Sequence, residues 1–567
     1  MNNKWVVKDK MPVLAREQLS RWRDEPLLQQ LFWNRELRSE QQAMAFVRRE
    51  FAHERDPFQL AGMDAAVERI LSALDARERI AVYGDYDVDG VTATLLLLEL
   101  LEAFGADVCP YVPRRREEGY GLHNTALEDL HAKGVRLVIT VDCGVSDLEQ
   151  AEHARTLGLD LIISDHHHVG EVLPSAVAVI NPKRADCSYP EQILCAVGIA
   201  YKIAAALLER RTPAQGGILA DKFLDLVALG TVADLAPLHG ENRAMVYAGL
   251  NQLNAKPRPG VTALLRAAGY KGLVSARTIG FELGPRLNAA GRLGSAMDAL
   301  RLLATQDREE ATHLAVELNE RNRVRQRLTR EISDRALEIA LEQAGGDDPL
   351  ILLAEHADFH VGVVGLAASR LCEQRQLPVV VAQSRDGLIT GSARSVPDFH
   401  VAEALMQCED LLLKHGGHAA AAGFTLAQRN WARFVRRLRQ IAEDQLSEKD
   451  LRRTLVIDAS VRSSDLTARL AEQLEYFEPY GHGNPPPLFI WRDAQVLEKR
   501  AVGTNDAHLK LKVRADSGVQ LDAIGFWLGH RLPQWPVKVD LAFAFEKDEW
   551  QGRERKQLNL KDVRAAV

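Results

Sequence analysis

The chain has 567 residues, of which 46% are hydrophobic and 26% are charged, and its formal net charge is −7. This length exceeds what one hydrophobic core can serve, so we expect two to four domains with the composition of an ordinary globular protein. The acidic total excludes a protein that binds nucleic acid through overall positive charge, although local basic patches can still do so.

The cysteines and the apolar runs indicate the cellular compartment in which the protein works. Six cysteines are scattered without a CxxC pair, which argues against a structural zinc site and a disulfide framework. The longest apolar run, TATLLLLELLEAFGA, is interrupted by Glu99 and Glu102 and is too short to span a bilayer. The first residues, MNNKWVVKDK, lack the apolar stretch of a signal peptide. We therefore expect reduced thiols, no membrane contact and a cytoplasmic location.

Taken in chain order, residues 1–55 are polar and charged and predict a helical extension without a chemical motif. From residue 79, short β-branched runs alternate with helical segments, which predicts βαβ units and a parallel sheet in a domain spanning 56–297. The runs that predict its strands are RIAVY, DVCPYVP, RLVITV, DLIIS and AVAVI.

The second half of the chain predicts three further parts. Residues 298–346 read as connecting helices that end at the linker signal GGDDP, and a smaller α/β domain follows at 347–448. Residues 452–567 contain short alternating runs, whose number and spacing suit a small all-β barrel such as an OB-fold.

Acids and histidines gather where the predicted strands end. Because ligands bind beyond the carboxyl ends of parallel strands, these side chains are candidates for one site. They are Asp85, Asp87, Asp89, Asp142, Asp165, His166, His167 and Asp234.

An extended segment would place Asp85, Asp87 and Asp89 on one side of the chain, where cations are needed to offset their repulsion. Oxygen ligands suit Mg²⁺, and an added imidazole favours Mn²⁺. Each motif alone has another reading, since DxDxDG also fits a calcium loop or a turn and DHH a solvated loop. Their joint occurrence predicts two divalent cations, Mn²⁺ or Mg²⁺. Two ions about 4 Å apart are a recurrent device for transferring phosphoryl groups to water, so a phosphoester is the expected substrate class.

The segments DYDVDG, VDCG, DHH and GTVADLAPL resemble four motifs of the DHH phosphoesterase superfamily. Within it, YVPRRREEGYGL, GPRLNAAGRL, HVGVVGLAASRL, GSARS and GGHAAAAGF are similar to segments of the RecJ single-strand DNA exonucleases. The resemblance covers about residues 79–425 and extends to the tail through PYGHGNPPPLF. It implies a parallel-sheet DHH domain, a long connecting helix, a smaller DHHA1 domain and a C-terminal OB-fold.

The resemblance also implies residue roles. Asp142 would bridge the two ions, and Asp165 would hold the imidazole of His166. Cys143 is treated as neutral, and His168 as a surface residue. The implied metal ligands are Asp85, Asp87, Asp89, Asp142, His166 and Asp234. The implied catalytic residues are Asp142, His166, His167, Asn288 and Arg292.

A further set would hold DNA. The implied phosphate or DNA contacts are Arg115, Tyr120, His360, Ser392, Arg394, Gly416, Gly417 and His418. Tyr120, Phe281 and Trp527 could stack on bases or could pack in the core. Lys510, Lys512 and Arg514 share one strand face, which suits either a DNA backbone or a solvated surface.

The resemblance implies a monomeric enzyme that degrades single-stranded DNA from its 5′ end to 5′-mononucleotides during repair and recombination. A single-strand binding protein and a RecQ-type helicase are partners by family analogy. One alternative is a DHH phosphodiesterase that acts on short oligonucleotides or cyclic dinucleotides, but the barrel and the long helical link favour a polymer. The other alternative, an inactive scaffold, conflicts with the full set of acids and histidines.

Overall fold

The structure is a computed structural model that describes residues 3–49, 55–115, 117–213, 216–217, 219–345, 348–515, 518–529, 538–550 and 553–566. The chain folds into two compact units, each built from segments that are distant in sequence. The α/β unit comprises Asp56–Asp234 and Gly249–Arg452, and the barrel unit comprises Met1–Arg55, Leu235–Ala248 and Arg453–Val567. These units cut across the domain limits expected from the sequence, which stay predictions.

The first sheet of the α/β unit is entirely parallel, as the alternation of strands and helices predicts. Its strand order is β3-β2-β4-β5-β6. Both faces are buried, which explains the continuous apolar runs. The strands are β2 (Arg79–Tyr83), β3 (Val108–Tyr111), β4 (Val135–Val141), β5 (Asp160–Ser164) and β6 (Ala178–Ile180).

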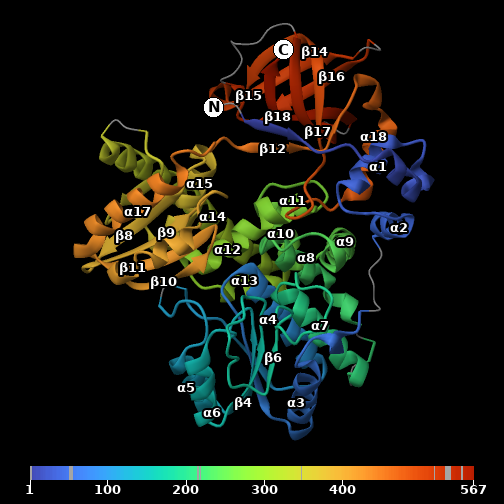
Figure 1. The fold of residues 1–567 in the computed structure, drawn as a ribbon. Helices are drawn as coiled ribbons and strands as arrows, with labels where there is room; N and C mark the ends of the chain where they lie inside the picture. Colours follow the sequence, from blue (N-terminus) through green and yellow to red (C-terminus); the bar gives the residue numbers. More distant parts are fainter. Residues whose placement is uncertain are drawn as a thin grey trace. The chain divides into compact units, whose positions relative to one another are not determined.

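Helices cover the two faces of this sheet. In Figure 1, α5 (Asn124–Ala132) and α6 (Leu148–Thr156) lie on one side of it. On the other side lie α3 (Met63–Ala76), α4 (Val88–Ala103) and α7 (Ala196–Arg210). Helix α8 (Leu224–Ala233) packs on α4 and α7.

The chain then runs through a helical region to the second sheet. The predicted connecting helices are the short α13 (Met297–Ala304) and the 37-residue α14 (Arg308–Ala344), which is the expected long helix. They are preceded by α9 (Gly240–Ala255), α10 (Pro259–Ala267), α11 (Ala276–Thr278), a π-helical turn (Ile279–Leu283) and α12 (Gly284–Leu293).

The second sheet is mixed, in the order β10-β11-β9-β8-β7. Helices α14 and α15 (Val361–Arg375) pack on one face, and α16 (Val401–Met406) and α17 (Trp431–Leu446) pack on the other. The strands are β7 (Leu352–Glu355), β8 (Val379–Arg385), β9 (Leu388–Arg394), β10 (Leu412–His418) and β11 (Ala421–Ala427).

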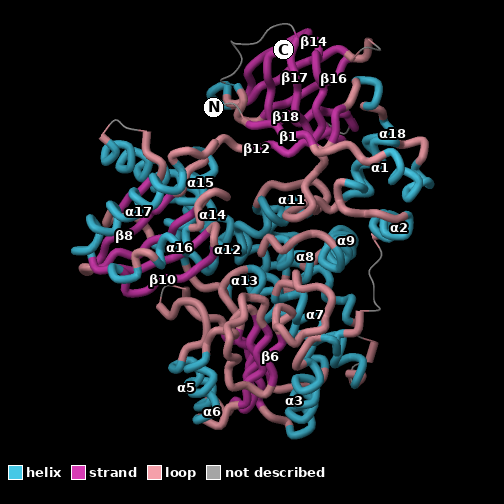
Figure 2. Tube along the Cα trace, in the orientation of Figure 1, coloured by secondary structure: helices cyan, strands magenta, loops and turns pink. Residues whose placement is uncertain are grey.

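The C-terminal strands close into a five-stranded barrel, because β14 pairs with β15 at one end of the order and with β17 at the other (Figure 2). The strands are β14 (Leu488–Val502), β15 (His508–Arg514), β16 (Gln520–Gly525), β17 (Lys538–Trp550) and β18 (Arg553–Ala565). The short β13 (Ala459–Ser460) joins β14, and α18 (Ala468–Leu474) precedes the barrel strands.

The N-terminal segment is not the purely helical extension that its sequence suggests. Its first strand β1 (Lys4–Val7) pairs in parallel with β12 (Thr454–Ile457), about 450 residues along the chain. A 3-10 segment (Val13–Trp22), α1 (Pro26–Trp33) and α2 (Glu40–Arg48) follow. Phe32 stacks on Phe477, so this segment shares its core with the barrel.

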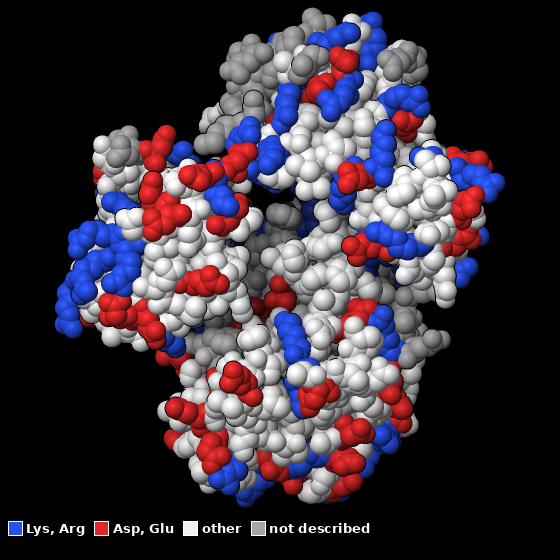
Figure 3. Space-filling model, viewed as in Figure 1, with Lys and Arg blue, Asp and Glu red and all other residues white. Residues whose placement is uncertain are grey.

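Among the described residues, no helix is long and apolar enough to cross a membrane. Acidic and basic side chains are interspersed over much of the face shown in Figure 3. A dense group of Lys and Arg lies over the second sheet and its helices, where α17 alone carries four arginines. The net negative charge therefore does not prevent local positive surfaces.

Candidate metal centre

The loop after β2 begins the site. Asp87 caps α4, because its carboxylate accepts a hydrogen bond from the Gly90 N–H at 3.1 Å. A Cβ at Gly90 would lie 2.6 Å from backbone atoms of Asp85, so glycine is what lets the loop fold against the helix start. Asp85 and Asp87 are thereby placed at the carboxyl edge of the sheet.

Asp89 lies in the first turn of α4 and is fully buried. Its carboxylate accepts hydrogen bonds from the N–H groups of Ala196 (2.7 Å) and Val197 (2.9 Å), the first residues of α7. The expectation of an extended segment from Asp85 to Asp89 is therefore wrong, because the cap at Asp87 starts the helix one residue later.

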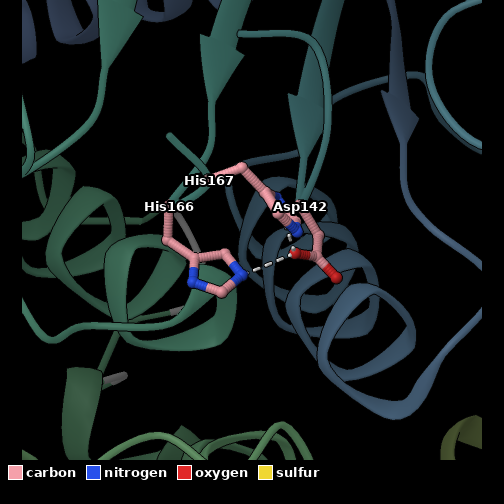
Figure 4. Close-up of side chains that lie close together, drawn as sticks. All are labelled: Asp142, His166 and His167. Atoms are coloured by element: carbon pink, nitrogen blue, oxygen red, sulfur yellow. Dashed lines mark ion pairs between the residues drawn. The ribbon is translucent and has the colours of Figure 1, made fainter. Parts of the chain in front are cut away.

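Asp142 follows β4 and is buried, with a left-handed backbone (φ 68°). Its Oδ1 lies 3.1 Å from Nε2 of His166 and 3.9 Å from Nδ1 of His167. Figure 4 shows both imidazoles directed at this carboxylate from the end of the neighbouring strand. A non-glycine residue in this backbone region is uncommon, and such strain concentrates at functional sites.

Asp165 organises the two histidines that follow it. Its Oδ1 accepts from the His166 and His167 backbone N–H groups and lies 2.7 Å from Nδ1 of His167. Burial alone would raise the pKa of Asp165, but its hydrogen bonds with His167 and with the Val145 N–H leave that pKa lowered. The expectation that Asp165 holds the His166 imidazole is wrong, since the ring it holds belongs to His167.

Asp234 caps the carboxyl end of α8, so the expectation that it lies at a strand end is wrong. Its Oδ2 lies 4.0 Å from Nδ1 of His166, whose Nε2 lies 3.9 Å from Oδ2 of Asp89. A helix carboxyl end disfavours a negative charge, so this carboxylate needs a positive partner.

The ligand atoms fall into overlapping groups that could each hold an ion, with the atoms of a group within 4.8 Å of one another. Asp142 occurs in two of the groups and His166 in two, as expected for ligands near a pair of ions. The groups are Asp85, Asp87 and Asp142; Asp89, His166 and Asp234; and Asp142, His166 and His167.

The donor set fits divalent cations. Three of its buried atoms, Oδ1 of Asp85, Oδ1 of Asp142 and Nε2 of His166, make no hydrogen bond among the described residues, although the last two form an ion pair at 3.1 Å. Buried polar atoms are almost always paired, so these atoms are left for an ion. Oxygen donors with one or two imidazoles suit Mn²⁺ and Mg²⁺.

The pKa values agree with this reading. Burial, and then repulsion from neighbouring carboxylates, raises the pKa of Asp89 to about 7 and that of Asp234 to about 9. The same causes raise the pKa of Asp85 and Asp142. Burial and the neighbouring His167 lower the pKa of His166 to about 3, which keeps its imidazole neutral and able to bind a metal.

Arg115 lies close to two further arginines, Arg292 and Arg394. The Arg115 guanidinium lies over the Tyr86 ring, 4.8 Å from its centroid. Burial, and then repulsion from Arg115 and Arg325, lowers the pKa of Arg292 to about 9. Burial and Arg115 likewise lower the pKa of Arg394. Like charges held close to Arg115 in this way fit an anion that binds all of them.

The other predicted contacts lie on the same unit. The Asn288 side chain accepts from the Val88 N–H (3.2 Å), beside the metal-binding loop. His360 caps α15 through its Nδ1, which accepts from the Gly362 N–H. A Cβ on Gly365 would lie within 3.2 Å of both Ser392 and Arg394, so helix α15 approaches β9 closely.

Gly416, Gly417 and His418 lie on β10, the edge strand of the second sheet, and are exposed. Gly417 needs to be glycine, because a Cβ there would lie 2.4 Å from the carbonyl oxygen of Ala421. The roles of these residues, like those of the acids and arginines, stay predictions.

Two contacts at the site were missed. The Lys183 ammonium donates to the carbonyl oxygen of His166, and Tyr86 supports Arg115. The position of Lys183 just past the AVAVI strand is a signal that could have been used. Arg116 lies outside the described residues.

The candidate stacking aromatics are not core residues. Tyr120, Phe281 and Trp527 are 45%, 69% and 74% exposed. The Tyr120 hydroxyl lies 2.9 Å from Nδ1 of His167 and donates to the carbonyl oxygen of Asp142 (3.0 Å). The reading of these three as packed aromatics is therefore wrong, and Tyr120 belongs to the metal site.

Three family descriptions match the chain. The DHH family N-terminal domain matches residues 79–231, the DHHA1 domain matches 347–447, and the RecJ OB domain matches 457–562. These matches fall on the parallel sheet, the mixed sheet and the barrel.

Similar proteins cover nearly the whole chain. The single-stranded-DNA-specific exonuclease RecJ of Salmonella typhimurium is 35% identical over 562 residues, which cover 95% of this chain and 96% of the relative. The Escherichia coli protein of the same name is 36% identical over the same shares.

Solved structures agree. RecJ from Thermus thermophilus in complex with Mn²⁺ matches with a TM-score of 0.84 and 32% identity, covering 100% of this chain and 80% of that one. The same protein in complex with Mg²⁺ matches with a TM-score of 0.78 and 30% identity, covering 100% and 79%. With this identity over almost the full length of its relatives, the chain belongs to the RecJ family of single-stranded-DNA-specific exonucleases.

Proposed function

We propose that this protein is a metal-dependent exonuclease that degrades single-stranded DNA from the 5′ end and releases 5′-mononucleotides in DNA repair and recombination. The observation that carries the proposal is a set of buried ligand atoms around Asp142 that make no hydrogen bond, in a chain whose relatives are named single-stranded-DNA-specific exonucleases. A binding protein or an inactive scaffold would have no use for such a costly arrangement.

The ligands of the two ions would be Asp85, Asp87, Asp89, Asp142, His166 and Asp234. When bound, divalent cations supply charge neutralisation at phosphorus and a nucleophilic water at neutral pH. The chain holds its carboxylates ready for this on rigid strand ends and helix starts.

His167 is suited to face the scissile phosphate. Asp165 and Tyr120 fix its ring, and the side chain is 38% exposed. Burial alone would lower the pKa of His167, but the hydrogen bond and charge of Asp165 leave it raised. The ring therefore keeps a proton that it can donate to a phosphate oxygen.

Arg115, Arg292 and Arg394 would bind phosphates of the strand, since guanidinium groups make bidentate phosphate contacts. A terminal 5′-phosphate held there would sit at a fixed distance from the acids, which would set both the polarity and the one-nucleotide product.

The barrel would lengthen the binding path for a strand. Trp527 and Phe526 are exposed beside His508, with ring centroids 5.1 and 5.2 Å from it. The outward face of β15 adds Lys510, Lys512 and Arg514, although Lys512 is paired with Glu498 at 3.2 Å. Exposed aromatics next to cations are typical of surfaces that stack bases and follow a backbone.

The finer assignments belong to the same proposal. The protein would act as a cytoplasmic monomer, and a single-strand binding protein and a RecQ-type helicase would be its partners. The family resemblance supports these assignments.

The test is digestion of a long single-stranded oligonucleotide, labelled at the 5′ or the 3′ end, with Mn²⁺ or Mg²⁺. Release of labelled mononucleotide from the 5′ end, abolished by chelation and by Asp142→Ala, is expected. If the long strand stays intact while short oligonucleotides or cyclic dinucleotides are hydrolysed, the DNA assignment is wrong and the phosphodiesterase alternative holds.

The barrel is tested with Trp527→Ala. Loss of a base-stacking ring should weaken binding of a long strand by about 1–3 kcal/mol, with dinucleotide hydrolysis unchanged. Val519→Ala, which truncates an exposed apolar side chain of the same barrel, is the matched control.

A further inference from the structure

The segment that follows Asp234 folds with the other unit. Asp234 ends the first segment of the α/β unit, and Leu235–Ala248 belongs to the barrel unit. The barrel unit therefore holds the chain immediately after a residue to which we assign a metal ligand.

A turn of the barrel unit grips this segment. The carbonyl oxygen of His482 accepts a hydrogen bond from the Leu238 N–H at 2.7 Å. A Cβ at Gly481 would lie 2.6 Å from the Leu238 side chain, which is fully buried. A Cβ at Gly483 (φ 73°) would lie 3.0 Å from Cβ and 3.2 Å from Cα of Pro237. Both glycines thus allow a close approach that a side chain would prevent.

The turn itself is fixed. Gly481 and Asn484 exchange backbone hydrogen bonds of 3.0 and 3.1 Å. The buried Asn484 amide donates to the carbonyl oxygens of Phe477 (2.7 Å) and Pro479 (2.9 Å), and its oxygen accepts from Arg35 (3.1 Å). Because its backbone and the Asn484 side chain are hydrogen-bonded, the turn is rigid. It therefore determines where Leu238 lies.

A second hold lies five residues further along the chain. The buried Arg243 guanidinium donates to the carbonyl oxygens of Phe46 (2.8 Å), Tyr476 (2.7 Å) and Glu478 (2.7 Å). Three charge-assisted hydrogen bonds make this a strong anchor. The start of α9 is therefore fastened to the same stretch of the barrel unit as Leu238.

The link between the grip and Asp234 is short and strained. Only four residue steps join Asp234 to Leu238, so their Cα atoms can lie at most about 14 Å apart. Leu235, in this link, has a left-handed backbone (φ 60°) and a 67% exposed side chain, so no packing of that side chain explains the conformation. A leucine in this region costs free energy and persists only where its surroundings impose it.

We propose that the turn formed by residues 479–484 is a positioning element for Asp234: by holding Pro237 and Leu238, it fixes the chain within four residues of a metal ligand. The proposal rests on the assignment of Asp234 as a ligand under the proposed function. It gives the GHGN stretch a role in the metal centre that is separate from any contact with DNA.

The test is a Mn²⁺ titration without DNA, by calorimetry or by electron paramagnetic resonance of free Mn²⁺. The variant is Gly483→Ala, whose Cβ would push against Pro237. The matched control is Gly518→Ala, at another left-handed glycine of the barrel unit (φ 82°) with open space around it. Gly483→Ala should lower the Mn²⁺ affinity by about tenfold, the size of effect typical of residues that orient ligands. Gly518→Ala should bind as the unmodified protein does.

Asp234→Asn separates the two assignments. If Asp234→Asn loses Mn²⁺ affinity and Gly483→Ala does not, the positioning proposal is overturned while the ligand assignment stands. If Asp234→Asn itself binds Mn²⁺ normally, the ligand assignment falls, and the positioning proposal falls with it.

A second variant covers the case in which Gly483→Ala does not fold, as judged by thermal unfolding. Leu235→Gly removes an exposed side chain and makes the link between Asp234 and Leu238 more flexible. The turn should then no longer fix the position of Asp234. This variant should also weaken Mn²⁺ binding, and unchanged affinity would overturn the proposal.

Discussion

Helices α4 and α8 pack side by side, and each carries an acid near both of its ends. The acids at one end of the helix pair are neutralised by an arginine, whereas those at the other end are not. At one end, Glu99 and Asp225 are both paired with Arg258, whose Nε lies 2.6 Å from Asp225 and whose Nη2 lies 3.3 Å from Glu99. At the other end, Asp89 and Asp234 face each other with raised pKa values.

The counter-charge around a buried acid distinguishes a structural acid from a functional one. Burial alone would lower the pKa of Arg258, but Asp225 and Glu99 outweigh it and leave that pKa raised, so this cluster carries its own counter-charge. The Asp89 end relies on backbone N–H groups and a neutral histidine, which leave negative charge unbalanced. Buried acids whose charge the protein leaves unbalanced indicate a cation site.

The largest effect on cleavage should come from a substitution at the end that holds the acids without a counter-charge. Asp142→Asn should lower the cleavage rate by about 10³-fold or more, because a metal ion stabilises the transition state by several kcal/mol. It should also raise the thermal unfolding temperature of the metal-free protein, since one repelling charge is gone.

The matched control for that variant is Asp225→Asn at the paired end. It should keep the cleavage rate per folded molecule and lower the unfolding temperature. Equal effects of the two variants on cleavage would contradict the distinction between the ends.

Breaking the paired end should mainly cost stability. Arg258→Met leaves the buried Asp225 without its counter-charge and leaves Glu99 with only Lys222, at 3.6 Å, so the free energy of unfolding should fall by about 3–5 kcal/mol. Urea unfolding measures this change, and Arg277→Met, at an exposed arginine of the same unit, should change it by less than about 0.5 kcal/mol. A small decrease in the free energy of unfolding for Arg258→Met would mean that water reaches Glu99 and Asp225.

The raised pKa values of Asp89 and Asp234 predict how the free energy of unfolding of the metal-free protein depends on pH. Asp89 and Asp234 have folded pKa values of about 7 and about 9, raised from 3.8, so between pH 4 and 9 the folded state binds more protons than the unfolded state. The free energy of unfolding of the metal-free protein should therefore fall as the pH rises through this window. Mn²⁺ should stabilise the protein more at pH 9 than at pH 6.

Thermal unfolding with a chelator, and then with Mn²⁺, tests this pH dependence. A metal-free protein whose stability rises between pH 6 and 9 would contradict it. Asp234→Asn should flatten the curve at its upper end.

The smallest effect should come from the edge of the site. Tyr120→Phe removes the hydroxyl that contacts His167 and the carbonyl oxygen of Asp142, which is worth about 1 kcal/mol, or about fivefold in cleavage rate. The loss should appear in kcat with Mn²⁺ affinity unchanged. A loss of Mn²⁺ affinity instead would mean that Tyr120 fixes Asp142.

Local sequence patterns were enough to place Asp85, Asp142 and Asp165 just after strands, because strand periodicity and βαβ order depend on near neighbours, but Asp234 lies at a helix end instead. They failed on Asp89, since the cap at Asp87 converts the expected extended segment into a helix. They also could not show Arg258, which meets Glu99 from 159 residues away. Contacts at such separation leave no periodic signal, and the same holds for the pairing of β1 with β12.

That pairing bears on how the protein is made. The segment around Phe32 emerges from the ribosome well before residues beyond 450, yet it packs against them. At about 5–20 residues per second, the segment waits roughly 20–90 s for its partners. During that time its apolar side chains need either a chaperone or rapid release of the finished chain. Deleting the barrel would make this exposure permanent, so a shortened protein should aggregate before its nuclease activity could be compared.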